Sequence, residues 1–405
     1  MRLKDVAFVN LRTLDESTKG DYKFRYIDIS SVSADNGITL GDEITFQEAP
    51  SRARRIVKKD DVLVSTVRTY LRAIANIDWD AKDIIASTGF AVYTPNNKII
   101  PRFLAYSIKS TKAINQICSN SKGVSYPAIQ AQVLSSIEIP YWDLKRQEAI
   151  AAYLDKECEK IGRKIELLER KADAYSRLRR SLINRAVTRG LDPNKTFKTS
   201  KSSICTEIPS HWQEKRIKDI FTEKSIKGYP NEPMLCATQS KGVIPQSLYE
   251  NRVVTAVSGL ENMKLVDVGN FVISLRSFQG GIEYAYYRGI ISAAYTILEL
   301  DTNNSRDYFR HFFKSLSLIK LMKKCVTGIR DGQNINYTTL KYEHIPVPPI
   351  DEQNEIAAYL DEKCAKIDAI LEKINTEVER LKELKRSLIN EVVTGQRAID
   401  TESRS

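Results

Sequence analysis

The sequence is poor in the residue types that build metal sites. Its 405 residues include only three histidines (His211, His311 and His344), and its six cysteines are scattered without any CxxC or CxxxC spacing. A structural zinc site needs clustered cysteine and histidine ligands, so we expect no metal site. Cys158 and Cys364 lie in apolar helical stripes and are expected to be small buried hydrophobic residues.

Long apolar runs are also missing. No stretch approaches the ~18 apolar residues that a membrane-spanning helix needs. The N-terminal MRLKDVAFVNL lacks the apolar core of a signal peptide. We therefore expect a cytoplasmic protein without a membrane partner, long enough for two globular domains and additional helices.

The sequence motifs of several catalytic classes are absent. Neither the phosphate-binding pattern GxxxxGK[ST] nor the patterns GxSxG and HExxH occur. An adenine methyltransferase would need an Asn/Asp-Pro-Pro-Tyr/Phe site for a flipped base, but the only Pro-Pro, at 348–349, is followed by Ile350. Asp361-Glu362-Lys363 could mimic a nuclease core, although on a heptad helix it is better interpreted as a solvated face. The sequence therefore predicts no catalytic residues.

Basic residues, in contrast, are in excess. The formal net charge is +11, with 62 lysines and arginines against 51 acidic residues. Such a surplus favours a polyanionic partner, because neutralising phosphates releases counterions. The charge alone does not decide the function, since many basic proteins do not bind nucleic acid.

The most informative feature is a repeat of about fifty residues that occurs twice, 206 positions apart. The first copy, 139–188, contains IPYWDLKRQEAIAAYLDKECEKI and RRSLINRAVT, and the second, 345–394, contains IPVPPIDEQNEIAAYLDEKCAKI and KRSLINEVVT. A period near 200 residues is too long for a solenoid. It indicates two domain-sized halves that end in the same helical element, and hence a pseudo-two-fold molecule.

The apolar residues of both copies follow the same helical spacing, with one extra step of three at Tyr175–Leu178 and at Leu381–Leu384. This pattern predicts an antiparallel coiled-coil seam with one stammer. Alternatively, each apolar stripe packs on its own globular domain. The predicted seam residues are Ile161, Ile165, Leu168, Tyr175, Leu178, Leu182, Ile367, Leu371, Ile374, Val378, Leu381, Leu384 and Leu388.

The globular halves resemble each other weakly. RLKDVAF (2–8) matches RIKDIF (216–221), and DDVLVSTVR (60–68) matches GNFVISLR (269–276). Strands are predicted near 26–32, 60–67 and 90–95 and a helix over 101–119. We predict an α+β fold with two globular α/β domains separated by two long antiparallel helices. Its segments are a first domain (1–138), a first helix (139–190), a linker (191–207), a second domain (208–344), a second helix (345–396) and a tail (397–405).

These motifs resemble those of a known family. IPVPPIDEQNEIAAYLD (345–361) with its twin (139–155), the paired RSLIN segments (180–184 and 386–390) and IPSHWQ (208–213) make the chain similar to the specificity subunit of type I restriction–modification systems. There are two departures. Tyr141-Trp142-Asp143 stands where the second copy has Val347-Pro348-Pro349, and the first domain lacks the Pro-x-x-Trp segment that opens the second.

The resemblance implies a non-catalytic subunit that binds double-stranded DNA. Each globular domain would be a target recognition domain that reads one half of a bipartite target, and the paired helices would set the spacer. Two methyltransferase subunits would bind beside the helices and methylate adenine. The S-adenosylmethionine cofactor is expected on that partner and no cofactor on this chain, and a motor-nuclease subunit can join the complex.

Reading bases requires guanidinium, amide and hydroxyl groups that reach the groove edges, while lysines and arginines hold phosphates. In the first domain the candidates are Arg52, Arg54, Arg55, Arg68, Tyr70, Arg72, Lys122 and Tyr126. In the second domain they are Gln239, Lys241, Arg276, Ser277, Gln279, Arg330, Gln333 and Asn334. In each domain the arginine-bearing strand end and the loop before the long helix are better candidates as groups than any single member.

Two other functions stay open. A coiled-coil scaffold that binds DNA without sequence preference would explain the charge and the helices, but it has no need for two different polar tips. A fragment of a fused restriction enzyme is disfavoured by the missing catalytic motifs.

Overall fold

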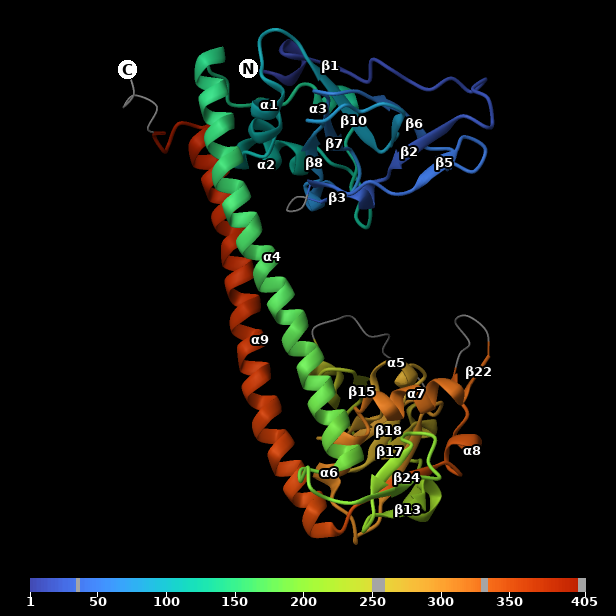
Figure 1. Ribbon diagram of the computed structural model, residues 1–405. Coiled ribbons are helices and arrows are strands. Elements are labelled where there is room, and N and C mark those ends of the chain that lie inside the picture. Colours follow the sequence, from blue (N-terminus) through green and yellow to red (C-terminus); the bar gives the residue numbers. More distant parts are fainter. Residues whose placement is uncertain (34–36, 250–258, 329–333, 400–405) are drawn as a thin grey trace. The chain divides into compact units, whose positions relative to one another are not determined.

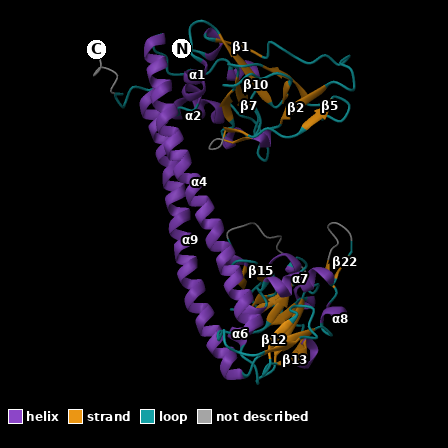
Figure 2. Cartoon of the chain, viewed as in Figure 1, coloured by secondary structure: helices purple, strands orange, loops and turns teal. Residues whose placement is uncertain are grey.

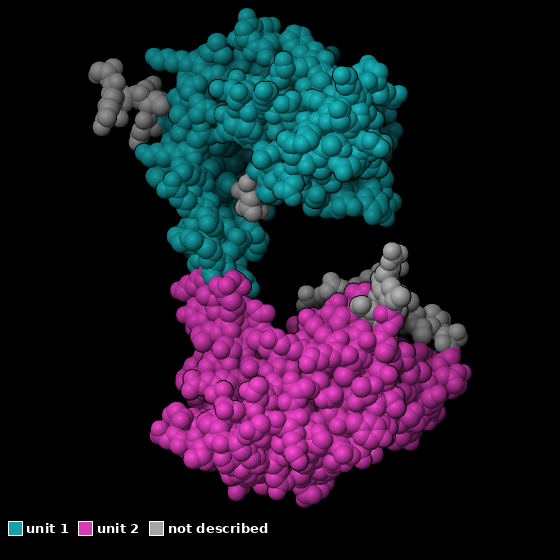
Figure 3. Space-filling view, turned by 45° about the vertical axis from the view of Figure 1, so that its right-hand side comes forward, with its two compact units in different colours: residues 1–170, 374–405 teal, residues 171–373 magenta. Residues whose placement is uncertain are grey.

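The computed structural model describes residues 1–33, 37–249, 259–328 and 334–399 (Figures 1 and 2). The chain divides into two compact units, which Figure 3 colours separately. Unit 1 comprises residues 1–170 and 374–405, and unit 2 comprises residues 171–373. The two long helices, α4 (Leu144–Arg189) and α9 (Ile350–Val393), each contribute one part to either unit.

Unit 1 is built on a four-stranded sheet, here called its first sheet, whose side chains alternate between two cores. Val62 and Val64 face the helices, while Leu63 between them faces a second sheet. Ala91 and Phe90 divide in the same way. The strand order is β1 (Ala7–Val9), β10 (Phe90–Pro95), β7 (Val62–Ser65) and β8 (Ile74–Asn76).

The second sheet of unit 1 covers the other face of the first sheet. Its strands β2 and β9 are parallel, and its other pairs are antiparallel. The strand order is β5 (Glu43–Thr45), β2 (Lys23–Ile27), β9 (Ile84–Ser87) and β6 (Ala53–Val57), with a short pair, β3 (Val32–Ser33) and β4 (Gly37–Ile38), beside it in the chain. The 3-10 turns of the unit are η1 (Leu3–Asp5), η2 (Ile29–Ser31) and η3 (Thr69–Leu71).

The single helix predicted over 101–119 is wrong, because the segment forms two helices. These are α1 (Pro101–Ile108) and α2 (Thr111–Ser119), and a short helix α3 (Ala131–Leu134) follows. Ser110 has extended backbone and its side chain caps α2 by accepting from the Ala113 N–H. A serine that satisfies free N–H groups starts a new helix and so interrupts the apolar periodicity.

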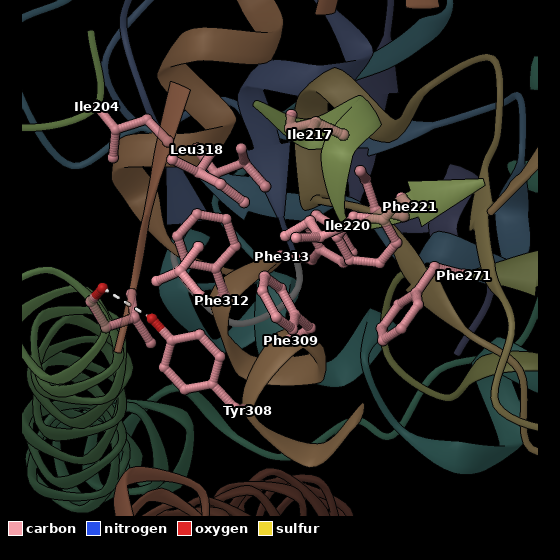
Figure 4. Close-up of a cluster of buried hydrophobic side chains, with 14 of the residues drawn as sticks. Ile204, Ile217, Ile220, Phe221, Phe271, Tyr308, Phe309, Phe312, Phe313 and Leu318 are labelled. Carbon is pink, nitrogen blue, oxygen red and sulfur yellow. Dashed lines mark hydrogen bonds between the residues drawn. The ribbon is translucent and has the colours of Figure 1, made fainter. Parts of the chain in front are cut away.

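Unit 2 repeats the first sheet with the order β14 (Phe221–Lys224), β21 (Thr296–Leu300), β18 (Phe271–Ile273) and β19 (Glu283–Tyr284). One face packs against α6 (Arg306–Phe312) and α7 (Leu316–Lys324) through an aromatic cluster (Figure 4). The rings of Phe221 and Phe309 meet edge to face at 5.1 Å, a favourable aromatic geometry. Tyr308 is fully buried, and its hydroxyl donates to the Val187 carbonyl at 3.2 Å, which fixes this core to α4 (Figure 4).

The outer part of unit 2 differs from that of unit 1. The strands here form two separate pairs, β15 (Leu235–Thr238) with β16 (Gly242–Pro245) and β17 (Lys264–Val266) with β20 (Gly289–Ile291). The remaining elements are β11 (Phe197–Thr199), β12 (Glu207–Pro209), β13 (Gln213–Arg216), η4 (Ile217–Asp219), η5 (Gln246–Leu248), η6 (Leu260–Asn262), α5 (Ser277–Gly280), β22 (Val326–Thr327), β23 (Asn334–Ile335), α8 (Tyr337–Leu340) and β24 (His344–Val347).

The two units therefore have equivalent frameworks, as the weak similarity of the halves predicted. Both first sheets have the same topology, and in both the first strand follows a 3-10 turn of the sequence Leu/Ile-Lys-Asp. Asp5 accepts from the Arg2 N–H and Asp219 from the Arg216 N–H, each at 3.2 Å. The strands expected within 60–67 and at 90–95 are confirmed as β7 and β10.

The predicted stammer is wrong. Leu178 and Leu384, the residues reached by the extra step of three, are 46% and 50% exposed. The half-buried residues at these points are their neighbours Arg179 and Lys385. With these two basic residues the spacing alternates 3 and 4 throughout, an unbroken heptad. The long aliphatic stem of a lysine or arginine can cover an apolar seam in place of a leucine side chain.

The other predicted seam residues are buried or half-buried. Ile165, Ile367, Ile374, Val378, Leu381 and Leu388 are buried, and Ile161, Leu168, Tyr175, Leu182 and Leu371 are half-buried. In unit 1, Lys164 of α4 pairs with Glu377 of α9 at 2.8 Å. In unit 2, the corresponding link joins Arg179 and Asp368 at 2.9 Å. The helices thus contact each other within each unit, and their ends also pack on the globular domains, so both arrangements considered for the stripes occur.

Within the described ranges, no helix combines the length and the apolar character that crossing a membrane requires.

Candidate nucleic-acid interface

In unit 1 a one-turn helix, η3, follows the central strand β7, and three of the candidate residues lie on it or directly beside it. Arg68 precedes the turn and Arg72 ends it, both with left-handed backbone (φ 49° and 52°). Thr69 between them is buried, whereas Tyr70 and the two arginines are exposed. The turn therefore holds its threonine inward and presents the arginines and Tyr70 to solvent.

The loop before the long helix joins this turn directly. The Arg68 N–H donates to the Pro127 carbonyl at 2.7 Å, and the hydroxyls of Thr69 and Ser121 lie 2.8 Å apart. The Arg68 guanidinium lies 4.8 Å from the centre of the Tyr126 ring, a cation–π contact. The strand-end group and the loop group predicted for the first domain, Lys122 and Tyr126 included, therefore form one continuous surface.

A turn between β9 and β10 brings Arg52 to the same region. The Thr88 N–H donates to the Arg52 carbonyl, and the Thr66 N–H donates to the Gly89 carbonyl, both at 2.8 Å. Two neighbouring residues of the turn thus hold Arg52 and the η3 segment. Arg52 is exposed and remains a candidate contact.

Arg54 and Arg55 are engaged inside the unit. The Arg54 guanidinium lies 4.9 Å from the centre of the Phe46 ring, and Arg55 donates to the Thr13 hydroxyl at 3.3 Å. Burial lowers the pKa of Arg55 below its usual range. Both side chains are half-buried, so they are weaker candidates for DNA contact than Arg52 and Arg68.

In unit 2 the equivalent one-turn helix is α5, which follows β18. Arg276 precedes it as Arg68 precedes η3, and Arg276 is likewise exposed. Ser277 corresponds to Thr69 and is only 2% exposed, with its hydroxyl accepting from the Ser274 N–H at 2.8 Å. Ser277 is therefore a weaker candidate for DNA contact than Arg276, because the turn uses its hydroxyl internally. Gln279 is exposed.

Lys314 stabilises the α5 turn through hydrogen bonds and an ion pair. Its ammonium group donates to the Gly280 carbonyl at 3.1 Å and to Glu283 Oε1 at 2.6 Å, and it lies 3.4 Å from the Gln239 carbonyl. Glu283 is 2% exposed, and burial raises its pKa to about 6 even though Lys314 acts in the opposite direction. Gln239 also packs closely over Gly280, so Gln239 and Gln279 belong to one surface.

Of the remaining candidates of the second domain, the structure describes Lys241 and Asn334. Lys241 is exposed in the β15–β16 turn, where its N–H donates to the Thr238 hydroxyl at 3.0 Å. Asn334 is half-buried on β23, which pairs with β22. Arg330 and Gln333 lie outside the described residues.

The repeat motif anchors each domain through a buried glutamine, a role that the sequence analysis did not predict. Gln147 accepts from the Ile100 N–H at 2.8 Å and donates to the Lys98 and Trp142 carbonyls. Its repeat partner Gln353 accepts from the Ser305 N–H at 2.8 Å and donates to Asn304 and to the Pro348 carbonyl. Each glutamine thereby fixes the start of one helix of its domain, α1 for Gln147 and α6 for Gln353.

The asparagines of the RSLIN segments anchor the opposite domains. Asn390, from the second repeat, accepts from the Thr111 N–H of the first domain at 2.9 Å. Asn184, from the first repeat, accepts from the Ser317 N–H of the second domain at 2.8 Å. The position of two copies of the same motif in the sequence could have suggested an anchoring role, but not this exchange of partners.

Two tryptophans pack at the ends of the long helices. They explain why the first half has Tyr141-Trp142-Asp143 before its helix and why only the second half opens with Pro-x-x-Trp. Trp142 donates to the Val393 carbonyl at 2.8 Å and packs over Gly395, whose φ is +77°. In unit 2, Trp212 donates to Glu352 at 3.0 Å and packs over Gly190, whose φ is +73°. The first half therefore carries its tryptophan just before the long helix, and the second half carries it at the start of the globular domain.

Comparison with known proteins agrees with this architecture. A family model described as the type I restriction modification DNA specificity domain matches residues 1–171 and 209–380. The MjaX type I restriction enzyme specificity subunit of Methanocaldococcus jannaschii is 24% identical over 88% of this chain and 82% of its own. The EcoKI specificity subunit of Escherichia coli strain K12 is 23% identical over 75% of this chain and 67% of its own.

The fold also matches a solved structure. A chain from a study of complex assembly and conformational transition in a type I restriction–modification system superimposes with a TM-score of 0.68 at 21% identity. The match covers 98% of this chain and 97% of the other.

Proposed function

Because the chain belongs to the family of type I restriction–modification DNA specificity domains, we propose that it reads a split DNA target, one half with each globular domain. In this proposal the chain itself does no chemistry and gives a methyltransferase complex its sequence specificity. The proposal rests on one contrast. The two units share the hydrogen bonds that hold each globular domain on the long helices, but they differ in the exposed residues around the turns η3 and α5, here called the tips. The glutamine and asparagine contacts recur in both units, while the exposed residues around η3 and α5 differ.

The chemistry of the tips suits base reading. Arg68 and Arg276 stand at equivalent exposed positions beside their turns. Arginine can bond guanine in the major groove with two N–H groups, and glutamine can bond adenine in the same way. Gln239 and Gln279 add two amides to the tip of unit 2, while Lys122 and Lys241 suit phosphate contacts.

The paired helices would set the spacer between the half-sites. Inserting one heptad into both α4 and α9 adds about 10 Å to each helix, which corresponds to roughly 3 bp at ~3.4 Å per pair. We expect the methylated target to gain a spacer of that size. An unchanged spacer in a folded insertion variant would contradict this part of the proposal.

The partners would be two methyltransferase subunits, which would bring S-adenosylmethionine, and a motor-nuclease subunit can join them. The support is a surface that the repeat presents twice. Leu178 and Leu384 occupy the same position in the two copies and are 46% and 50% exposed. Large apolar side chains in equivalent exposed places suit a partner that binds in two copies.

A scaffold that binds DNA without sequence preference is the alternative. Competition binding separates the two functions: the purified chain is bound to fragments of its host genome, and random duplex is added as competitor at several salt concentrations. We expect a retained class of fragments that share a split motif. Equal displacement of all fragments, with one common salt dependence, would favour the scaffold.

A further inference from the structure

Unit 1 exposes four large apolar side chains on its two joined loops. Tyr70 is 56% exposed, Leu71 47%, Val124 102% and Tyr126 65%. Single exposed apolar residues are common on proteins. Four of them on two loops that hydrogen-bond to each other, here called the apolar tip, are what a binding surface would present.

The backbone of η3 is arranged to push this tip outward. Arg68 and Arg72 both adopt the left-handed conformation, which costs about 1 kcal/mol or more for each residue that is not glycine. Thr69 is held inside by its contact with Ser121, so Tyr70 and Leu71 have to point away from the core. The strained backbone of the turn thus holds two apolar side chains in solvent.

Positive charge surrounds the tip. Arg68 and Arg72 flank Tyr70 and Leu71, and Lys122 is exposed on the neighbouring loop beside Val124. An apolar centre with a basic rim matches a partner whose outside is anionic and whose inside is apolar, as in duplex DNA with its phosphates and stacked bases.

Unit 2 lacks this combination at the equivalent turn, within the part of the chain that the structure describes. Phe278, which corresponds to Tyr70, is half-buried and packs against the aromatic core, and Gln279 replaces Leu71. Leu275, which directly precedes Arg276, is an exposed apolar residue next to this turn. The two turns are equivalent in backbone position but differ in the chemistry that they present.

We propose that Tyr70 and Leu71 form a wedge that enters the DNA between two adjacent base pairs of the half-site read by unit 1, while Arg72 and Lys122 hold the flanking phosphates. This inference rests on the proposed function. Apolar side chains inserted between base pairs unstack them and kink the duplex. Unit 1 then selects a step that is easily unstacked, in addition to the bases that its arginines contact, whereas unit 2 relies on polar groups at base edges.

The test uses the purified full chain without a methyltransferase, because that enzyme would add its own base flipping. The target motif is first identified from fragment selection. Each adenine of both half-sites is then replaced in turn by the fluorescent base 2-aminopurine, which brightens when it loses its stacking neighbours. We expect a severalfold rise at one step of one half-site, and no rise in the other half-site.

Variants assign the wedge. Tyr70→Ala with Leu71→Ala is expected to abolish the rise and to weaken target binding about tenfold or more, as the loss of one base-stacking side chain does. Leu275→Ala is the matched control in unit 2 and is expected to keep the rise. Circular dichroism verifies that the variants are folded.

Three results would overturn the wedge. The first is selective target binding with no fluorescence rise at any position. The second is a rise that persists in the folded double variant. The third is an equal loss of affinity when the wild-type chain binds a target in which uracil replaces thymine. That result would place Tyr70 and Leu71 on thymine methyl groups in the groove and not between base pairs. If the wild-type chain selects no motif at all, the proposed function fails instead, and no 2-aminopurine measurement is then needed to reach that conclusion.

Discussion

The two units use the same framework to present different surfaces. In unit 1 the first sheet is backed by a second four-stranded sheet, and its tip shows exposed apolar and basic residues. In unit 2 the outer strands form two separate pairs, and the described part of the tip shows Arg276, Gln279 and Gln239. The difference teaches that the contacts which hold a domain on the helices are constrained, whereas the reading surface can change.

The largest expected effect concerns the anchors that the two units share. Gln147→Ala or Gln353→Ala leaves several buried polar groups without partners, each costing about 1–3 kcal/mol. We expect a loss of about 4 kcal/mol in the unfolding free energy of the unit concerned. Hydrogen exchange should show the loss in unit 1 for the first variant and in unit 2 for the second.

An exposed glutamine supplies the control for this comparison. Gln132 lies on α3 and is exposed, so Gln132→Ala should change stability little. If Gln147→Ala destabilised both units equally, the view that each repeat anchors one particular domain would have to be given up.

A smaller effect is expected at the tips. Arg276→Ala with Gln279→Ala removes two candidate base contacts, together about 3 kcal/mol of discrimination. We expect methylation mapping to show relaxed sequence in one half-site only. Arg68→Ala or Arg52→Ala should relax the other half-site by a smaller amount, and Arg54→Ala serves as a control because its side chain packs on Phe46. A variant that changed both half-sites together would contradict the assignment of one half to each unit.

Leu178 and Leu384 are equivalent in the two repeats, so changing each of them tests whether both repeats bind a methyltransferase subunit. Leu178→Asp or Leu384→Asp places a charge on an exposed apolar position, and we expect the loss of one methyltransferase subunit per variant, with a penalty of about 2 kcal/mol or roughly thirtyfold in affinity. Mass measurement of the assembled complex would count the subunits. Glu383→Asp, a change beside Leu384 that keeps the charge, is the matched control, and full assembly by both leucine variants would exclude these positions from the docking surface.

The smallest expected effect is a pH dependence specific to unit 2. Burial raises the pKa of Glu283 from 4.5 to about 6, so the folded state holds its proton more tightly than the unfolded state. The associated stability is fully present below pH 4.5 and is lost as the pH rises to about 6, by about 2 kcal/mol at most. Denaturant unfolding across this range should show the decline in the wild type, and its difference from Glu283→Gln isolates the carboxyl group. Parallel stability curves for the two proteins would contradict this explanation.

The sequence predicted the architecture because the repeat is a regular pattern. The duplicated halves follow from the repeated motifs, and the strands β7 and β10 and most of the helix seam follow from the pattern of apolar residues. The predicted stammer was wrong because the pattern was assigned to the apolar residues Leu178 and Leu384. A basic residue with a long aliphatic stem can also occupy a seam position. Arg179 and Lys385 take these positions.

The site was predicted only in part. The arginine-bearing strand ends and the loops were found from residue type, and the structure joins them in unit 1. Ser277 was included as a candidate because a hydroxyl gives no sign in the sequence of whether it points inward, and the structure buries it. The anchoring roles of Gln147 and Asn390 depend on contacts between distant parts of the chain, which a single sequence does not specify.

The central claim is that each unit reads one half of a split target. The most direct measurement is a map of every methylated adenine in a genome where the wild-type chain acts with its methyltransferase. The account predicts one motif with two short defined blocks separated by a constant number of unspecified base pairs. A continuous motif, or methylation that does not depend on this chain, would contradict it.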